Sequence, residues 1–184
     1  MSGSPPSPSA LRVANLSPKA PKPFVIVPDP SALQDLAQDL GVDALRKLRF
    51  EGALAAQGKK DWALTGTLGA TVVQPCAVTL APVTTRIETS VERLFVHDLE
   101  EPDAPETEMP EDDRVEALGA WIDPEAIMIE ALTLEIPQYP RADGAVLGET
   151  VVTELGKAAL RDVDLKPFSG LAALKTQIKA RDSG

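Results

Sequence analysis

The first half of this chain alternates apolar and polar positions with a period of two, which is the pattern of half-buried β-strands. Three long runs follow this rule, and their apolar positions are Leu48, Phe50 and Leu54; Trp62, Leu64, Leu68, Ala70 and Val72; and Val83, Ile87, Val91 and Phe95. A loop-forming segment, Gly58-Lys59-Lys60-Asp61, separates the first two runs, so the sequence predicts three long antiparallel strands. Gly66 and Gly69 lie inside the second run, and glycine within a strand favours a bulge or bend, so we expect a strongly curved sheet.

Helical periodicity is confined to three short segments. Ser31, Asp123-Pro124 and Ser169 are suitable helix starts, because their side chains can cap unpaired N–H groups and proline fits the first turn. The residues expected to share a face are Leu33, Leu36, Ala37 and Leu40, ended by Gly41; Ile127, Ala131 and Leu134, ended by Pro137 and Pro140; and Leu171, Leu174 and Ile178. A short strand from Phe24 to Val27 precedes the first helix. The predicted fold class is α+β: a curved antiparallel sheet, open or barrel-like, with about three short flanking helices.

A length of 184 residues suits one domain better than two. Residues 1–22 are rich in Ser and Pro and carry basic residues but no acid, which predicts a flexible basic tail. We expect a single domain over residues 23–180. It includes an irregular segment at 141–166, and a short tail follows at 181–184.

The net charge of −10 is concentrated in one segment. Residues 98–116 contain ten acidic residues and one basic residue, Arg114, so they contribute −9 and the remainder of the chain contributes −1. Prolines interrupt this run, which cannot bury enough apolar surface to offset the entropy of ordering, so we expect a flexible acidic loop. The loop either serves as a solvated insertion or imitates phosphate, occupying a basic protein or the chain's own basic surface.

Cysteine content and hydropathy indicate the compartment. Cys76 is the only cysteine, which excludes an internal disulfide, and the N-terminus lacks the basic-then-apolar pattern of a secretory signal. No apolar run approaches the roughly 20 residues that a membrane-spanning helix needs. We therefore expect a soluble, cytoplasmic protein with no membrane partner.

Few residues are suited to catalysis or metal binding. A structural zinc site needs four ligands of suitable type, and Cys76 and His97 are the only cysteine and histidine, so no metal site is predicted. A nucleophile elbow, a phosphate loop and a dinucleotide motif are all missing, and the carboxylates cluster in the acidic loop, where no buried environment would tune them. The sequence therefore predicts a non-enzyme with no catalytic residue, cofactor or small-molecule substrate.

Basic residues on the polar sides of the strands are better candidates for function. Arg46, Lys47 and Arg49 gather at the start of the first long strand, and Arg86 projects from the polar side of the third. Their ordinary role is solvated surface, and contact with RNA or a partner protein is the alternative. Arg93 differs, because it falls on the apolar side of its strand. It either pairs with an acid at the rim or marks a strand break or a contact site.

Three blocks of the chain resemble the YceD family, also called the large ribosomal RNA subunit accumulation family. The first has the form C-x-x-T-L-x-P, with Cys76, Thr79 and Pro82, and many relatives carry a second cysteine where Thr79 stands. The second contains Glu130, Leu132, Leu134, Ile136 and Pro137, and is similar to the family's E-x-L-x-L-x-L-P element. The third is Lys166-Pro167-Phe168 leading into Leu171, Leu174 and Lys175, similar to the family's PF-x-x-L-x-x-L-K ending. The resemblance spans residues 23–180 and indicates an alphaproteobacterial-like member.

The resemblance implies a bacterial factor, without established catalytic residues, that supports accumulation, processing or stability of large-subunit ribosomal RNA. Its expected partner is ribosomal RNA or a basic large-subunit ribosomal protein. With Thr79 in place of the second cysteine, the resemblance does not extend to a metal-dependent role. Two alternatives stay open: a small-molecule-binding or enzymatic domain that uses a cavity around Cys76, and a protein-interaction adaptor outside the ribosome.

Overall fold

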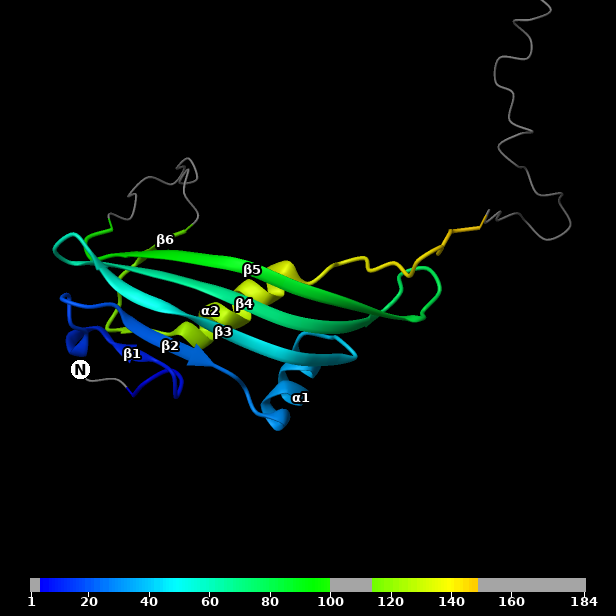
Figure 1. Ribbon diagram of the computed structural model, residues 1–184, viewed down its shortest axis with the longest axis horizontal. Coiled ribbons are helices and arrows are strands. Elements are labelled where there is room, and N and C mark those ends of the chain that lie inside the picture. The colour runs from blue at the N-terminus through cyan, green and yellow to red at the C-terminus, as the bar shows by residue number, and fades with distance from the viewer. Residues whose placement is uncertain (1–3, 100–113, 149–184) are drawn as a thin grey trace, which may run out of the picture. The chain divides into compact units, whose positions relative to one another are not determined.

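The computed structural model describes residues 4–99 and 114–148 of the chain (Figure 1). The chain divides into two compact units, Met1–Ala145 and Val146–Gly184, and the architecture that follows is that of the first unit. Its elements in chain order are β1 (Leu11–Arg12), a 3₁₀ helix (Val13–Asn15), β2 (Lys22–Ile26), α1 (Pro30–Asp39), β3 (Ala44–Gln57), β4 (Asp61–Pro75), β5 (Pro82–Val96), β6 (Val115–Ala117), β7 (Trp121–Ile122) and α2 (Pro124–Glu135).

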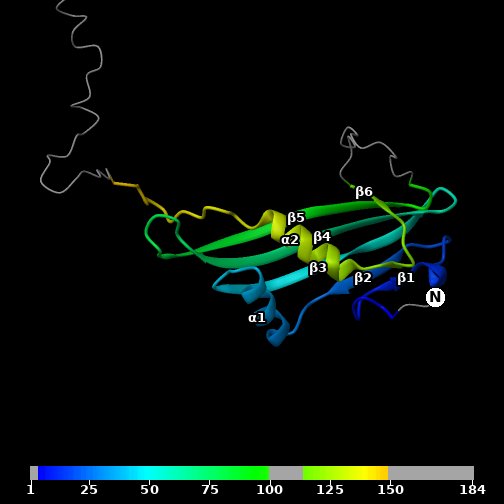
Figure 2. The ribbon, with the colours of Figure 1, turned by 180° about the vertical axis from the view of Figure 1, so that it is seen from behind.

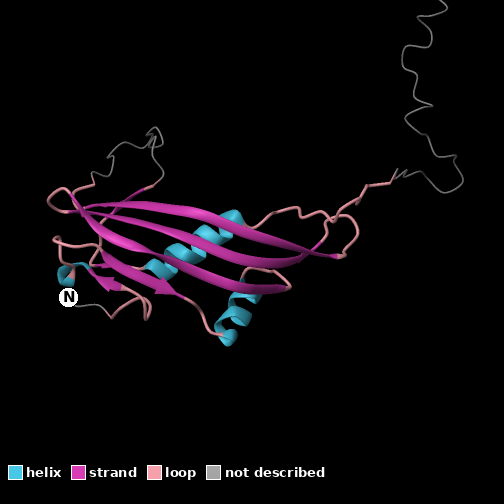
Figure 3. Ribbon diagram, in the orientation of Figure 1, coloured by secondary structure: helices cyan, strands magenta, loops and turns pink. Residues whose placement is uncertain are grey.

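An open five-stranded sheet in the order β2-β3-β4-β5-β6 forms the body of this unit (Figure 3). Strands β2 to β5 pair antiparallel, which confirms the three predicted long strands, and β6 pairs parallel to β5. The outer strands β2 and β6 pair over only five and three residues, and they do not meet. Since closure would require the outer strands to pair, the barrel-like alternative is wrong for this sheet.

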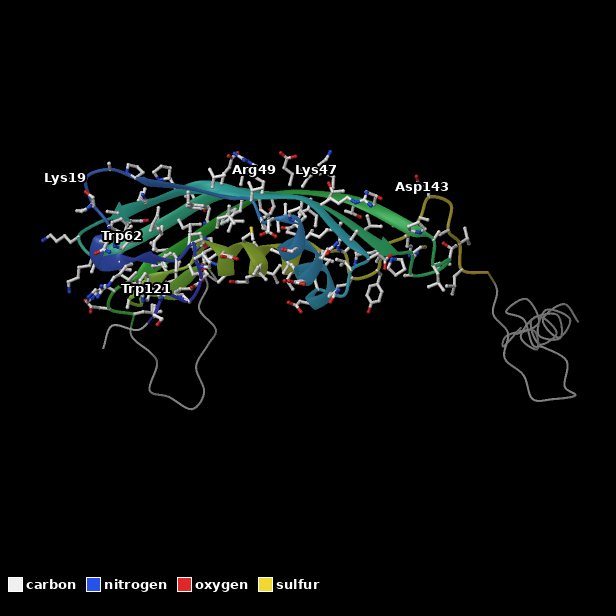
Figure 4. All side chains as sticks on the ribbon, turned by 90° about the horizontal axis from the view of Figure 1, so that it is seen from below. Lys19, Lys47, Arg49, Trp62, Trp121 and Asp143 are labelled. Carbon is white, nitrogen blue, oxygen red and sulfur yellow. The ribbon has the colours of Figure 1, made fainter. Side chains whose placement is uncertain are left out.

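The hydrophobic core lies on one face of the sheet. Figure 2 shows α2 crossing the face that α1 also covers, and no described element covers the opposite face (Figure 4). The apolar sides predicted for β3, β4 and β5 are confirmed, because every predicted position is buried except Val83, which is partly exposed. The largest fully buried side chains of the core are Phe50, Leu48, Leu54, Leu64, Leu68, Ile122, Met128 and Leu132.

The irregularity in the sheet lies in β3, whereas the glycines of β4 led us to expect it there. Arg46 pairs with Thr71 and Arg49 pairs with Gly69, so three steps along β3 match two along β4, and β3 carries one extra residue. This bulge explains how Leu45 and Leu48 are both buried although their spacing is odd.

Gly66 has a different role. A Cβ at this position would lie 2.8 Å from Cε2 of Phe50, so the absence of a side chain makes room for the Phe50 ring.

The two described helices agree with prediction in position but differ in detail. The residue that caps α1 is Asp29, whose Oδ1 accepts the Ala32 N–H at 2.9 Å, while the predicted cap Ser31 donates its hydroxyl to the same oxygen. In α2 the predicted cap Asp123 is confirmed. Leu134, expected on the buried face of α2, is 74% exposed.

The reason is that α2 packs through a different stripe, formed by Ile127, Met128, Ala131 and Leu132. Leu134 falls at the flank of that stripe. The third predicted helix, from Ser169, lies outside the described residues.

The described part of the N-terminal segment contacts the domain. Strand β1 pairs antiparallel with β7, and Leu11, Val13 and Leu16 pack against the core. The Ser7 hydroxyl also donates to Oδ1 of Asp123 at 2.7 Å, at the start of α2. The domain boundary at residue 23 stays a prediction, but β1 shows that the segment before it contributes contacts to the fold.

Two further predicted segments are only partly described. Of the acidic loop 98–116, residues 100–113 lie outside the described part, and β6 begins at Val115 within its C-terminal end. Of the irregular segment 141–166, residues 141–148 contain neither helix nor strand, and the remainder lies outside the description.

Candidate functional site

Strand register brings four of the five predicted basic residues together on the open face of the sheet. Arg46 of β3 and Arg86 of β5 both pair with Thr71 of the strand between them. Neighbouring strands lie about 4.8 Å apart, so the Cα atoms of the two arginines are separated by about 10 Å. Lys47 and Arg49 project from the same face, away from α2 (Figure 4). We call Arg46, Lys47, Arg49 and Arg86 the basic patch.

The positive charge of the basic patch is only partly compensated. Arg49 forms an ion pair with Glu51, and Nη2 of Arg86 lies 4.0 Å from Oε2 of Glu88. The arginine side chains of these pairs are half exposed, so each pair contributes little to stability. Among the residues that the structure describes, neither Arg46 nor Lys47 takes part in an ion pair.

Two backbone features shape the patch. Lys47 occupies the bulge of β3 with φ of 52°, a left-handed conformation that is uncommon outside glycine and that re-aims the side chain. Gly69 lies beneath Arg86, and a Cβ there would come within 2.7 Å of Nη2 of Arg86. The missing side chain thus leaves space for the guanidinium over β4. Sequence reasoning missed Gly69 and Thr71 as parts of this site, because only the register shows which residues they face.

Arg93 lies apart from the basic patch, on the face that the helices cover. Its Nη2 donates to Oε1 of Glu130 on α2 at 2.7 Å, and its Nε lies 3.1 Å from Oε1 of Glu116 on β6. Its side chain is only 14% exposed. Of the two interpretations offered for Arg93, pairing with acids at the rim is what the structure shows. Glu116 was hidden from sequence reasoning, because it belongs to a segment expected to be a flexible loop.

Cys76 is fully buried in the turn between β4 and β5. Its Sγ accepts backbone N–H groups from Val78 and Thr79 at 3.4 Å and from Ala142 at 3.3 Å. The hydrogen bond from the Thr79 side chain has the largest effect on the Cys76 thiol, and those from these backbone groups add to it. Together they lower the pKa of the thiol to about 6, because they stabilise the thiolate. The sulfur therefore joins the β4–β5 turn to the chain that follows α2.

Two other family-motif positions, Pro82 and Pro137, lie at backbone contacts of the β4–β5 region. Pro82 opens β5 opposite Pro75, and the Pro137 carbonyl accepts the Nε2–H of Gln74 at 3.1 Å. Phe168 lies outside the described residues.

The structure does not bring Cys76 and His97 together. They flank opposite ends of β5, roughly 45 Å apart at the usual rise of a strand, so they form neither a catalytic pair nor a metal pair. Within residues 4–99 and 114–148, no cluster of three or more His, Cys, Asp or Glu side chains could hold a metal ion.

These features define the class of protein: a small α+β protein whose described helices α1 and α2 cover one face of a mostly antiparallel sheet, with a basic patch on the other face. Residues 64–175 match the family described as Large ribosomal RNA subunit accumulation protein YceD. The match covers more than half of the chain, so the protein belongs to the YceD family. The family name implies a role in accumulation of large-subunit ribosomal RNA.

No curated protein and no solved structure matches the chain. Among the described helices, none is both long and apolar enough to cross a membrane.

Proposed function

We propose that this YceD protein is a non-catalytic factor that supports accumulation of large-subunit ribosomal RNA in the bacterial cytoplasm by binding RNA through the basic patch. The observation that supports this proposal is the register of β3, β4 and β5. It gathers Arg46, Arg49 and Arg86 on a face that no described element covers.

Electrostatics favour RNA phosphates as the ligand of this face. Lys and Arg supply most of the affinity for a phosphate backbone, and hydroxyl groups add hydrogen bonds. Thr67, Thr71 and Ser90 lie on the same face, beside the basic patch. Since the acidic segment 98–116 accounts for −9 of the net charge of −10, the remainder of the chain is almost neutral, and the overall charge does not oppose RNA binding locally.

Acidic residues make the two ends of the open face different in charge. Glu51 and Glu92 lie further along the strands, beyond the basic patch. The RNA backbone would therefore follow the end of the sheet where β3 and β5 begin, and it would avoid the end near the β3–β4 hairpin.

A basic ribosomal protein is the second candidate partner. The feature that favours it is the acidic segment 98–116, whose charge complements a basic protein surface. By contrast, chemistry at Cys76 is not favoured even though the pKa of its thiol is lowered, because its sulfur is buried and already accepts three backbone hydrogen bonds.

Matched charge reversals test the RNA proposal. Lys47→Glu inverts one charge of the basic patch, and Lys59→Glu makes the same change in the exposed β3–β4 turn. In titrations of fragments of large-subunit ribosomal RNA, Lys47→Glu should weaken binding several-fold and reduce the slope of log K against log salt by about one. Lys59→Glu should bind as the unchanged chain does. Equal effects of the two variants would contradict the assignment of the patch.

Affinity capture with and without nuclease separates the two partner classes. Loss of ribosomal partners after nuclease treatment supports RNA, whereas retention of a basic large-subunit protein supports the second candidate. The role itself is tested by depleting the protein and measuring precursor and mature large-subunit RNA. Unchanged levels of both would rule the role out.

A further inference from the structure

Among the strands that the structure describes, none pairs with most of the β5 edge that faces away from β4. On the side away from β4, β6 pairs only with Leu94, Phe95 and Val96, and no other described strand lies beside residues 82–93 (Figure 1). An exposed strand edge presents a row of N–H and C=O groups that can pair with another strand.

The hydrogen bonds to the segments beside β5 show which residues present these groups. The Leu94 N–H donates to the Arg114 carbonyl, and the Val96 carbonyl accepts the Leu118 N–H. Backbone groups of a strand alternate between its two sides, and the pairing of β4 with β5 has no irregularity. Residues 84, 86, 88 and 90 therefore direct their N–H and C=O groups toward the free side.

The sequence along this edge is chemically symmetric about Ile87. Read outward from Ile87, the matching positions are Arg86 and Glu88, Thr85 and Thr89, Thr84 and Ser90, and Val83 and Val91. We propose that two copies of this chain pair through the free edges of their β5 strands, antiparallel, with Ile87 facing Ile87 of the second copy.

This register allows both backbone hydrogen bonds and opposite-charge pairs to form between the two copies. Residues 86 and 88 of opposite copies face each other, as do 84 and 90, and all four present their backbone groups to the partner, so each facing pair can exchange two N–H···O bonds. Arg86 of each copy lies opposite Glu88 of the other, which gives two opposite-charge pairs. The paired stretch ends at Val91, before Leu94, where β6 begins, so β6 does not obstruct the second copy.

Neighbouring registers are less favourable. Centring the pairing on Ser90 would place Glu88 opposite Glu92 of the other copy, and like charges directly opposite are destabilising. Centring it on Thr89 would also give two opposite-charge pairs, Arg86 with Glu92 of the other copy, but it would place Thr84 opposite Leu94, where β6 already lies. The register centred on Ile87 is therefore favoured, because it keeps a longer stretch, residues 83–91, clear of β6.

A groove beside β5 supports the same arrangement. It has a volume of about 390 Å³ and is lined by Val91 of β5 and by Ala131 and Leu134 of α2. Leu134 is 74% exposed in the single chain. Polar and charged side chains, among them Thr89 and Glu135, also line the groove, so its surface is mixed. In the proposed register, Val83 of the second copy lies opposite Val91 on the helix-covered face, so it would cover the apolar part of the groove.

Measuring the mass of the full-length chain in solution tests the proposal. Sedimentation equilibrium or light scattering between about 1 and 100 µM, the range that resolves micromolar association, should show the average mass rising toward twice that of one chain. Ser90→Pro removes an N–H on the free side and leaves the pairing with β4 intact, so it should weaken association at least tenfold. Ser90→Ala is the matched control and should associate as the unchanged chain does.

A charge swap tests the register independently of proline. Glu88→Arg places arginine opposite arginine twice and should weaken association, whereas the double variant Arg86→Glu/Glu88→Arg should restore it. Both side chains are at least half exposed, so the fold should tolerate the changes, and circular dichroism checks this.

A chain that stays monomeric over the whole concentration range overturns the proposal. So does a dimer that Ser90→Pro leaves unchanged, or a Glu88→Arg effect that the double variant fails to reverse. These outcomes leave the RNA proposal intact, since its test uses Lys47.

Discussion

Arg86 and Arg93 lie seven positions apart on β5, and this odd separation sends their side chains to opposite faces of the sheet. Arg86 joins the basic patch on the open face, whereas Arg93 is held by Glu116 and Glu130 on the covered face. Arginine therefore has two roles on β5, because alternate residues of a strand point to opposite faces of the sheet. The sequence placed both arginines on the correct sides, but it did not show which acids Arg93 meets.

Ionisation of Cys76 predicts a pH dependence of stability. Hydrogen bonds lower the pKa of the thiol from 9.0 to about 6 in the folded chain, so between about pH 6 and pH 9 the unfolded chain binds more protons. The ionised Cys76 therefore contributes fully to the free energy of unfolding above about pH 9. This contribution falls as the pH is lowered and is lost below about pH 6. Urea denaturation at a series of pH values should show the advantage of the unchanged chain over Cys76→Ser growing with pH. Parallel curves for the two proteins would contradict the assigned shift.

At the scale of elements, both described helices begin at an aspartate followed by proline. Asp29 of α1 binds the start of its own helix. Asp123 of α2 accepts the N–H groups of Glu125 and Ala126 and also the Ser7 hydroxyl. Asp123 therefore stabilises both a helix and the docking of the N-terminal segment.

Because of this difference, replacing the two capping aspartates should lower the free energy of unfolding by unequal amounts. Loss of a helix cap costs about 1 kcal/mol, so Asp29→Ala should lower the free energy of unfolding by about that amount. Asp123→Ala should cost about 2 kcal/mol, because it also removes a hydrogen bond from outside the helix. Chemical denaturation at neutral pH measures both changes. Equal costs would show that the Ser7 contact contributes nothing to stability.

At the scale of the whole molecule, the N-terminal segment packs against the part of the chain that matches the family. The family match begins at residue 64, yet β2 and β3 lie before it and supply one side of the sheet. Further upstream, Leu11, Val13 and Leu16 pack against the core, and Leu11 pairs with the buried Ile122. Hydrophobic burial therefore extends well beyond the part of the chain that matches the family.

Deleting residues 1–16 should consequently lower the free energy of unfolding by about 3 kcal/mol, since three partly buried apolar side chains leave the core. Thermal and urea denaturation of the shortened chain measure the loss. The control is deletion of residues 1–6, which retains Ser7, β1 and the apolar contacts and should leave stability unchanged. A 1–16 deletion as stable as the full chain would show that this packing is not stabilising.

The sequence determined the long strands of this protein, because a period of two over many residues leaves no other regular structure in which the apolar side chains share one face. It also determined the start of α2, through Asp123 and Pro124, and the family, through the C-x-x-T-L-x-P block and its companions. These are local signals, and each can be read within a few residues.

Only the tertiary structure decided what depends on register and on distant partners. The short pairing of β1 with β7 has no periodicity to reveal it, and the bulge at Lys47 appears only when β3 is aligned with β4. The Cys76 sulfur likewise accepts a hydrogen bond from Ala142, 66 positions further along the chain. The basic patch exists because Arg46 and Arg86 face the same residue of β4, and pairing between strands, which sequence spacing does not encode, sets that relation.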